Sequence, residues 1–335
     1  DNNIVTYNEI RDRSDATGRP TMGIFSTGSS TALTQYNNNC VISNNSIHDW
    51  FIDGSTVQFA VNIGAGNTGW SIDSNSFYQT AARTNTITSG STRAINISFA
   101  ATLATNGGFN VRNNFIGGTA PGATGGDWTV NVGGTAIVHT FIPIAMTTGL
   151  IPNTVSGNVI RNIDFTTVSP TAAATSFAGM SLAQGFYNVT GNTIGATTGN
   201  NNIKITINLS TGTNNTCFLA GVLFGSASPC GMDFTNNNIG SITIAGTATS
   251  AVFMQCVQHQ GNPVTTSLIQ GNVIGSTTTA NSIQLNVPAQ ALIFGMRSTV
   301  ANSYIPVINN NTIMNLTDNS TNVNTQDFGI LLTST

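Results

Sequence analysis

The chain repeats one six-residue pattern of apolar and polar positions along its length. In this pattern, Φ-x-x-N-x-(I/F), an apolar residue stands three places before an asparagine, and isoleucine or phenylalanine stands two places after it. Nine copies satisfy both apolar positions. Their asparagines are Asn8, Asn45, Asn75, Asn114, Asn158, Asn192, Asn237, Asn272 and Asn311.

Each copy predicts two short strands that meet at a sharp bend. The residue before the asparagine is Gly or Asn in all copies except those with Tyr7 and Ser74, and Gly and Asn tolerate left-handed backbone angles. A further apolar segment precedes every copy after the first and predicts a third strand, while Thr-, Ser- and Gly-rich stretches predict turns and outward loops. These apolar segments are MGIF (22–25), FAVNI (59–63), AINI (94–97), IVHTFI (137–142), FAGMSL (177–182), AGVLF (220–224), SAVFM (250–254) and ALIFGM (291–296).

The spacing of the copies indicates a solenoid. Their mean interval of about 38 residues lies in the range of solenoids and propellers. Propeller blades need antiparallel hairpins, and the sequence has neither regular hairpin turns nor a WD-like signature. We therefore predict an all-β fold, a right-handed parallel β-helix of about nine coils, with residues 1–335 as a single domain. Coils ~4.8 Å apart would form a rod of roughly 40 Å.

The repeated asparagine predicts an asparagine ladder along this rod. An asparagine at the same corner of every coil places one side-chain amide above another, so that C=O and N–H groups of neighbours can pair. Such pairing satisfies polar groups that would be costly to bury alone. We expect a structural role for all nine asparagines.

Composition excludes several classes of protein. Hydrophobic residues make up 39% of the chain and the net charge is only −3, which favours a folded core over disorder. Lys204 is the one lysine and the eight arginines are scattered along the chain, so the sequence lacks the basic footprint that nucleic-acid binding requires. No apolar run is long enough for membrane insertion, and residues 1–30 lack the features of a signal peptide.

The repeats resemble a known group of proteins. The repeated words, the segments NNNCVISNNSIHDWF (37–51) and GNTGWSIDSNSFYQT (66–80), and the low-charge Thr- and Asn-rich background are similar to right-handed parallel β-helix proteins of the Bacteroidetes cell surface. The resemblance covers nearly the whole chain. It implies secretion of the type IX kind and an extracellular or cell-surface location, although no sorting domain is visible.

Both ends of the sequence fall inside repeats. The chain starts within one repeat, and residues 327–335 match the strand that precedes a copy. Because solenoids normally end in polar caps, we expect a segment of a longer polypeptide or a filament unit. The expected partners are then neighbouring segments or subunits of the same surface assembly.

One pair of carboxylates is a candidate metal site. Asp12 and Asp49 both stand four residues after their repeat asparagine, and Gln79 follows at the same place in the next coil. Two stacked carboxylates would invite a cation, and Ca²⁺ prefers oxygen ligands. Two solvated surface aspartates are the alternative. The sequence predicts no other cofactor, because His48, His139 and His259 differ in their positions within the repeat.

Cysteine and aromatic residues give weaker signals. Cys217 and Cys230 could close a short disulfide loop, or they could be buried free thiols like Cys40 and Cys256. Outward aromatic side chains could stack on sugar rings, but several adjoin strand segments and could equally belong to the core. These aromatic residues are Trp50, Trp70, Trp128, Tyr36, Tyr78 and Tyr304.

These observations favour a non-catalytic extracellular protein, namely a surface stalk, filament or adhesin segment. The alternative is a β-helix that binds or degrades polysaccharides with a site in its long loops, such as residues 117–128 or 195–216, which makes glycans a second class of partner. Ice binding is a third hypothesis, suggested by the abundance of Thr. It requires regular Thr-x-Thr words, and those at Thr84 and Thr247 differ in their distance from the repeat asparagine.

Overall fold

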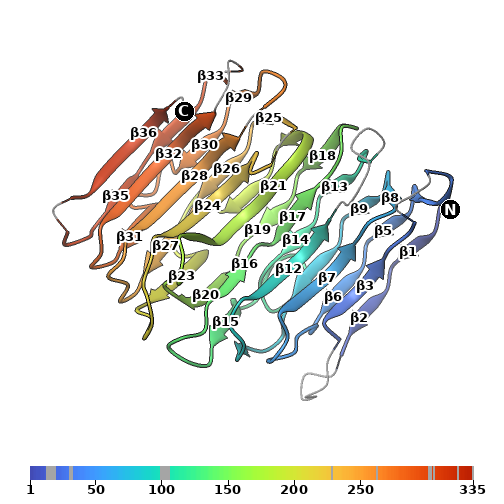
Figure 1. The fold of residues 1–335 in the computed structure, drawn as a ribbon, viewed down its shortest axis with the longest axis horizontal. Coiled ribbons are helices and arrows are strands. Elements are labelled where there is room, and N and C mark those ends of the chain that lie inside the picture. Colours follow the sequence, from blue (N-terminus) through green and yellow to red (C-terminus); the bar gives the residue numbers. More distant parts are fainter. Residues whose placement is uncertain are drawn as a thin grey trace.

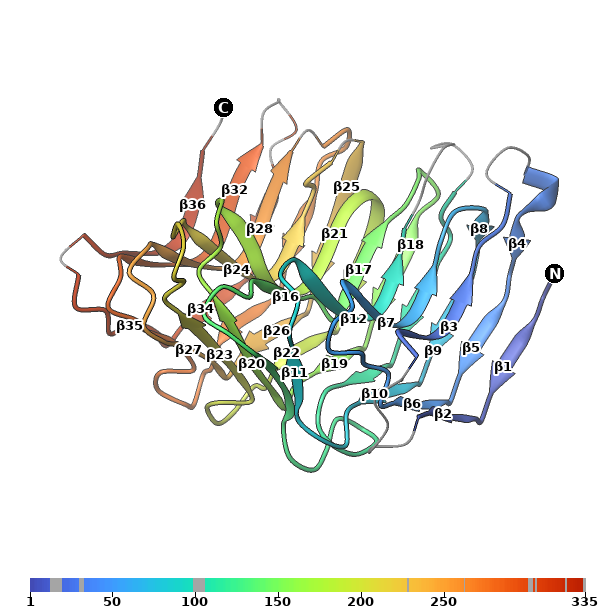
Figure 2. The same cartoon turned by 60° about the horizontal axis from the view of Figure 1, so that its bottom comes forward.

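The chain folds into a stack of parallel strands. The computed structural model describes residues 1–12, 20–29, 33–98, 106–227, 229–261, 263–300, 304, 306–322 and 324–333. In Figures 1 and 2 the strands lie side by side, coil after coil, from the blue N-terminal end to the red C-terminal end. The pairings between these strands are parallel and join each coil to the next, so the predicted parallel β-helix is confirmed.

The two strands of each repeat copy form two sheets, called sheets 1 and 2. The apolar residue before the asparagine lies in sheet 1, and the isoleucine or phenylalanine after it lies in sheet 2. The strands of sheet 1 are β1 (Ile4–Thr6), β5 (Val41–Ser43), β9 (Ser71–Asp73), β13 (Asn110–Arg112), β18 (Asn153–Ser156), β25 (Cys230–Thr235), β29 (Leu268–Gln270), β33 (Val307–Asn309) and the C-terminal half of β21 (Ala174–Thr190). Those of sheet 2 are β2 (Glu9–Arg11), β6 (Ser46–His48), β10 (Ser76–Tyr78), β14 (Phe115–Ile116), β19 (Val159–Ile160), β22 (Thr193–Gly195), β26 (Asn238–Gly240), β30 (Val273–Gly275) and β34 (Thr312–Met314).

The predicted third strand forms sheet 4, which long β21 joins to sheet 1. Sheet 4 contains β3 (Met22–Ser26), β7 (Val57–Ile63), β12 (Gly90–Ile97), β16 (His139–Phe141), β17 (Ile144–Thr147), β24 (Cys217–Phe224), β28 (Val252–Gly261), β32 (Ala291–Val300), β36 (Gln326–Leu332) and the N-terminal half of β21. The described residues also contain a small pair, β4 (Asn37–Asn38) with β8 (Asn67–Thr68), and one 3-10 turn, η1 (Leu33–Gln35).

The expectation of three strands per repeat was wrong, because a fourth strand follows sheet 2 in most coils. These strands form sheet 3 and lie within stretches that were predicted to be loops. In most of them apolar positions alternate with polar ones, and in β23 the burial alternates in step. The strands are β11 (Arg83–Asn85), β15 (Trp128–Val132), β20 (Ile163–Val168), β23 (Ile203–Asn208), β27 (Ile242–Ala245), β31 (Ile283–Asn286) and β35 (Leu316–Asp318).

The predicted bend is present in every copy of the repeat. The residue before each asparagine has a left-handed φ, between 52° at Asn310 and 67° at Gly271. Tyr7 and Ser74, which are neither Gly nor Asn, both adopt a φ of 57°. The position within the coil therefore imposes this backbone angle on any residue that occupies it.

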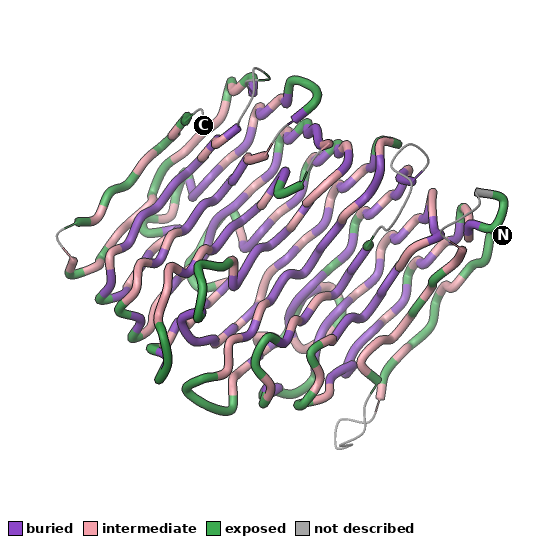
Figure 3. The backbone as a smooth tube through the Cα atoms, viewed as in Figure 1, coloured by how far each residue is buried: buried purple, intermediate pink, exposed green. Residues whose placement is uncertain are grey.

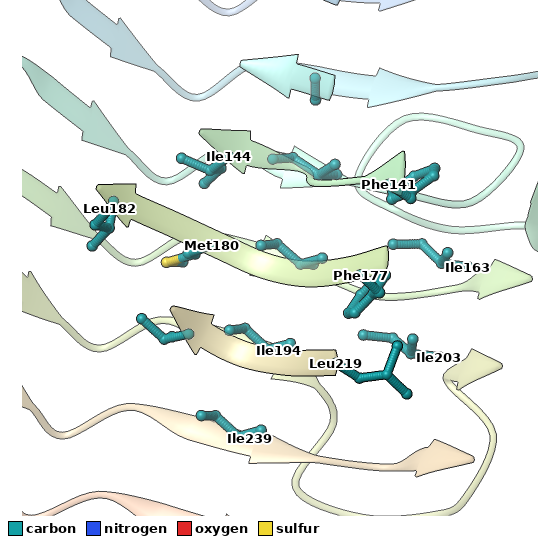
Figure 4. Packing of buried hydrophobic residues seen from close by; sticks show 14 of the residues in the cluster. Phe141, Ile144, Ile163, Phe177, Met180, Leu182, Ile194, Ile203, Leu219 and Ile239 are labelled. Carbon is teal, nitrogen blue, oxygen red and sulfur yellow. The ribbon is translucent and has the colours of Figure 1, made fainter. Parts of the chain in front are cut away.

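The core fills the space enclosed by the sheets. Phe177 and Leu219 from sheet 4 point toward Ile203 of sheet 3 and Ile194 of sheet 2 (Figure 4). Burial is concentrated in the strands, whereas loops and outermost strands are more exposed (Figure 3). A β-carbon on Gly179 would lie 2.9 Å from Ile194 Cγ2, so glycine allows sheet 4 to approach sheet 2 closely at this point.

The nine repeat asparagines stand in one line along the rod, buried from Asn45 to Asn272, and we call this line the asparagine row. At each of its eight steps, the backbone N and Nδ2 of one asparagine both donate to Oδ1 of the next, over 2.8–3.1 Å. From Asn45 onward, Nδ2 also donates to a sheet 1 carbonyl of the preceding coil. Each side chain from Asn45 to Asn272 therefore joins three consecutive coils.

Replacing a central member of the row tests its contribution to stability. Asn192→Ala removes the acceptor of Asn158 N and the donor to the Val155 carbonyl, both inside the rod. A buried group left unpaired costs about 1–3 kcal/mol, so we expect the free energy of unfolding to fall by about 3 kcal/mol in urea titrations. The control, Asn238→Ala on the outside of sheet 2, should change it by less than about 0.5 kcal/mol. Equal effects for the two variants would contradict a special role for the row.

Candidate functional site

A buried cluster of charged and polar side chains surrounds Asp49. The Asp49 carboxylate accepts from Arg83 Nη2, from Thr80 Oγ1 at 2.8 Å and from Thr80 N at 3.1 Å, and its Oδ2 lies 2.9 Å from His48 Nδ1. Arg83 Nε donates to Gln79 Oε1 at 2.9 Å. Asp49 and Arg83 are 2% and 5% exposed, so the ion pair belongs to the interior of the fold. Within this cluster, the charges neutralise one another and the hydrogen-bonding groups pair with one another.

The arrangement around Asp49 removes the reason for expecting a calcium ion between Asp12 and Asp49. The register of β2 with β6 places Asp12 beside Asp49 on neighbouring coils, as the repeat predicted. However, the Asp49 side chain turns inward and is neutralised by Arg83, so the two carboxylates do not form a repelling pair. Within the described ranges, no group of three or more His, Cys, Asp or Glu side chains could hold a metal ion.

Of the two alternatives for Cys217 and Cys230, the structure shows buried free thiols and no disulfide. All four cysteines are free and buried. Cys217 begins β24, whereas the Cys230 sulfur lies next to Gly225, just beyond the other end of that strand. An eight-residue strand spans over 20 Å, far more than the ~7 Å that a disulfide allows between Cα atoms. Burial raises the pKa of Cys217 to about 12 and that of Cys230 to about 11, which disfavours the reactive thiolates.

The three histidines lie in different coils and serve separate buried contacts. His139 is fully buried, with Nε2 2.8 Å from Thr92 Oγ1. His259 lies between the hydroxyls of Ser298 and Ser267, at 3.1 and 3.2 Å, and stacks on a phenylalanine. Burial lowers the pKa of both His139 and His259 to about 4. Both side chains are therefore neutral inside the rod at physiological pH.

Most of the aromatic residues considered as sugar platforms belong to the core. Trp50 and Trp128 are each 1% exposed and make an edge contact with ring centroids 5.2 Å apart. Trp70 is 7% exposed and donates from Nε1 to the Asn37 carbonyl. Tyr36 and Tyr78 are also buried, whereas Tyr304 is 43% exposed. Their buried rings are not available to stack on a ligand outside the rod.

Part of the outer face of sheet 4 is apolar. A second hydrophobic cluster, separate from the core, contains Ile142, Ala145, Ala178 and Ala220, with Leu223 packed against it. These residues alternate along their strands with core residues, so they lie on the opposite side of the sheet. Sheet 3 differs, since its outward positions in consecutive coils are occupied mainly by polar side chains.

An aromatic stripe continues this apolar outer face toward the C-terminal coils. It consists of Phe218, Phe253, Phe294 and Phe328, one from each of four consecutive coils, with ring centroids 5.2–6.3 Å apart. The Arg297 guanidinium lies over the Phe294 ring at 5.2 Å. A sheet face of this kind is typical of surfaces that pack against another protein.

Asp127, Asp164 and Lys204 form a half-exposed cluster outside sheet 3 that was not predicted. Lys204 Nζ lies 2.5 Å from Asp127 Oδ2, and Asp164 is the register partner of Lys204 in the preceding coil. Partial burial, with help from the negative charge of Asp127, raises the pKa of Asp164 above its ordinary value. Aligning the alternating segments IDFTTV and IKITIN would have placed Asp164 beside Lys204, but Asp127 comes from a loop whose path the repeat does not specify.

No family model, curated protein or solved structure matches this chain. Within the part of the chain that the structure describes, no helix is long and apolar enough to cross a membrane.

The buried histidines predict a pH-dependent stability. In the unfolded chain their pKa is about 6.5, whereas His139 and His259 titrate near 4 in the fold, so the unfolded state binds more protons between these values. The free energy of unfolding should therefore fall as the pH drops from 6.5 toward 4, by up to about 1.4 kcal/mol per pH unit for each histidine. Urea titrations at pH 7, 6 and 5 measure it. His259→Gln keeps hydrogen-bonding groups and should reduce the slope; an unchanged slope would contradict this assignment.

Proposed function

We propose that this chain is a non-catalytic extracellular structural or adhesive β-helix, a segment of a surface stalk, filament or adhesin. The observation that carries this proposal is the asparagine row, which joins the coils by hydrogen bonds at all eight steps. A continuous network of this kind favours a stiff rod of fixed register. Stiffness and length are the properties that a stalk or filament requires.

The burial and internal contacts of the titratable groups support a non-catalytic role. His139, His259 and the Asp49–Arg83 pair are buried and engaged in contacts within the rod, and the cysteines are buried thiols. Catalytic acids, bases and nucleophiles instead need access to substrate and a pKa suited to their task. These groups are better explained as parts of the core.

The apolar part of the outer face of sheet 4 supports lateral association with neighbouring units of a surface assembly. The whole outer face, nine strands about 4.8 Å apart with about six residues each, covers roughly 800 Å², and its apolar residues share it with polar ones such as Asn62, Asn96 and Gln258. This is about the area that each partner contributes to a stable protein interface. Sheets commonly pack face to face through such apolar surfaces, with interdigitating side chains.

A charge on this face tests the association. We expect the protein to self-associate at micromolar concentrations in sedimentation velocity experiments, and Phe253→Lys to weaken association at least tenfold, because it buries an unpaired charge in the contact. The matched control is Thr235→Lys on sheet 1, which should associate like the unmodified protein. Equal weakening by both substitutions, or a monomer at every concentration, would contradict the proposed interface.

A polysaccharide-binding or polysaccharide-degrading protein is the second candidate function, and the cluster of Asp127, Asp164 and Lys204 favours it. The loop that carries Asp127 is held to the rod by Arg161 Nε and Asn162 Nδ2, which donate to the Ala123 carbonyl at 3.2 and 2.8 Å. The raised pKa of Asp164 is the property of a general acid, and a second carboxylate nearby is the usual requirement for glycoside hydrolysis.

Incubation with a panel of neutral and acidic polysaccharides distinguishes the two functions. If the protein is structural, no new reducing ends and no unsaturated uronates should appear, as measured by reducing-sugar assay and by absorbance near 235 nm. New ends that disappear in Asp164→Asn but persist in the exposed control Asp53→Asn would instead establish catalysis by the cluster.

A further inference from the structure

A depression of about 320 Å³ lies on the outside of sheet 1, next to the turn from sheet 4. Phe186 and Asn188 from β21 contribute to its surface together with Gly231 and Asp233 from β25. Pro152 and Thr265, from the loops of adjoining coils, also line the depression. Its volume lies at the lower end of the range for small-molecule sites and is suited to a single sugar ring.

The register of β21 with β25 brings the key side chains together. Phe186 pairs with Gly231, and Asn188 pairs with Asp233. A β-carbon on Gly231 would lie 2.6 Å from Phe186 Cδ1 and 2.4 Å from Thr265 Oγ1. Glycine at this position therefore allows the half-buried phenylalanine ring to lie against the backbone of the next coil.

The polar groups around this ring suit a polyol. Asn188 and Asp233 are exposed and stand on adjacent strands ~4.8 Å apart. Asp233 Oδ1 accepts from Leu268 N at 3.3 Å, which holds the carboxylate in place and leaves Oδ2 available to accept from a ligand hydroxyl. The Asn188 amide can both donate and accept, and the Thr265 hydroxyl is exposed.

We propose that this depression binds one ring of a neutral glycan. The apolar face of the sugar lies against Phe186, while two neighbouring ring hydroxyls contact Asp233 and Asn188. Among the residues that the structure describes, the lining contains the Asp233 carboxylate and no basic side chain, so it repels uronates and other acidic sugars and favours a neutral ligand. This inference deepens the proposed adhesive function by naming its ligand class.

Titration with neutral oligosaccharides tests the proposal on the whole chain. The probes are manno-, galacto- and xylo-oligosaccharides, with oligogalacturonate as the acidic comparison, and binding is followed by saturation-transfer NMR and calorimetry. At least one neutral probe should bind, and Asp233→Asn and Asn188→Ala should each weaken its binding at least fivefold. The matched control Asp53→Asn, an exposed carboxylate outside the depression, should bind as well as the unmodified protein.

Phe186→Leu keeps an apolar side chain of similar length but removes the flat ring, and it should weaken binding at least tenfold. Thermal melts verify that each variant is folded, and Asn188→Ala provides an independent test should Phe186→Leu unfold. The proposal is overturned if no neutral probe binds, if oligogalacturonate binds more tightly, or if binding survives the substitutions at Asp233 and Asn188. None of those outcomes bears on lateral association, which the sedimentation experiment tests separately. Failure of the sugar site and failure of the proposed function are therefore distinguishable.

Discussion

The architecture depends on how each coil satisfies the backbone hydrogen-bonding groups at its left-handed bend. The bend takes the N–H of each repeat asparagine out of the ordinary strand ladder and, from Asn45 to Asn272, into the buried interior. The Oδ1 atom of the asparagine one coil further on accepts from that N–H and from the side-chain amide beside it. Because each asparagine can accept hydrogen bonds from the preceding one only when the two coils are aligned, this interaction sets the register of sheets 1 and 2.

The register that the asparagine row sets between coils also determines which side chains of neighbouring coils lie beside one another in the other sheets. Apolar residues of successive coils stack within the core, so that Phe141, Phe177 and Leu219 follow one another along sheet 4 (Figure 4). Outside the rod, the same stacking gathers residues of one kind into continuous surfaces, such as the aromatic stripe on sheet 4. A substitution at one outward position therefore changes one coil of a surface that several coils share, while the interior is left intact.

Loops of unequal length are tolerated because they leave the register unchanged. The loop that carries Asp127 and the turns around Thr265 project from the stack and bring polar groups to the outside of the strands. The structure thus separates a hydrogen-bonded interior from outer surfaces whose chemistry can change without altering the register. This separation is consistent with an adhesive or structural role, in which the surfaces select partners.

The sequence alone determined the solenoid, its nine repeats, the bend before each asparagine and the alignment of the asparagines, because these depend on local backbone angles and on one repeated spacing. It did not reveal sheet 3, whose short alternating strands are stable only when neighbouring coils pair with them. Only the tertiary structure decided that Asp49 pairs with Arg83, that Cys217 and Cys230 lie at opposite ends of a strand, and that Asp127 reaches Lys204. Such contacts depend on the path of each loop and on whether a side chain turns inward or outward, and neither is encoded in the repeat itself.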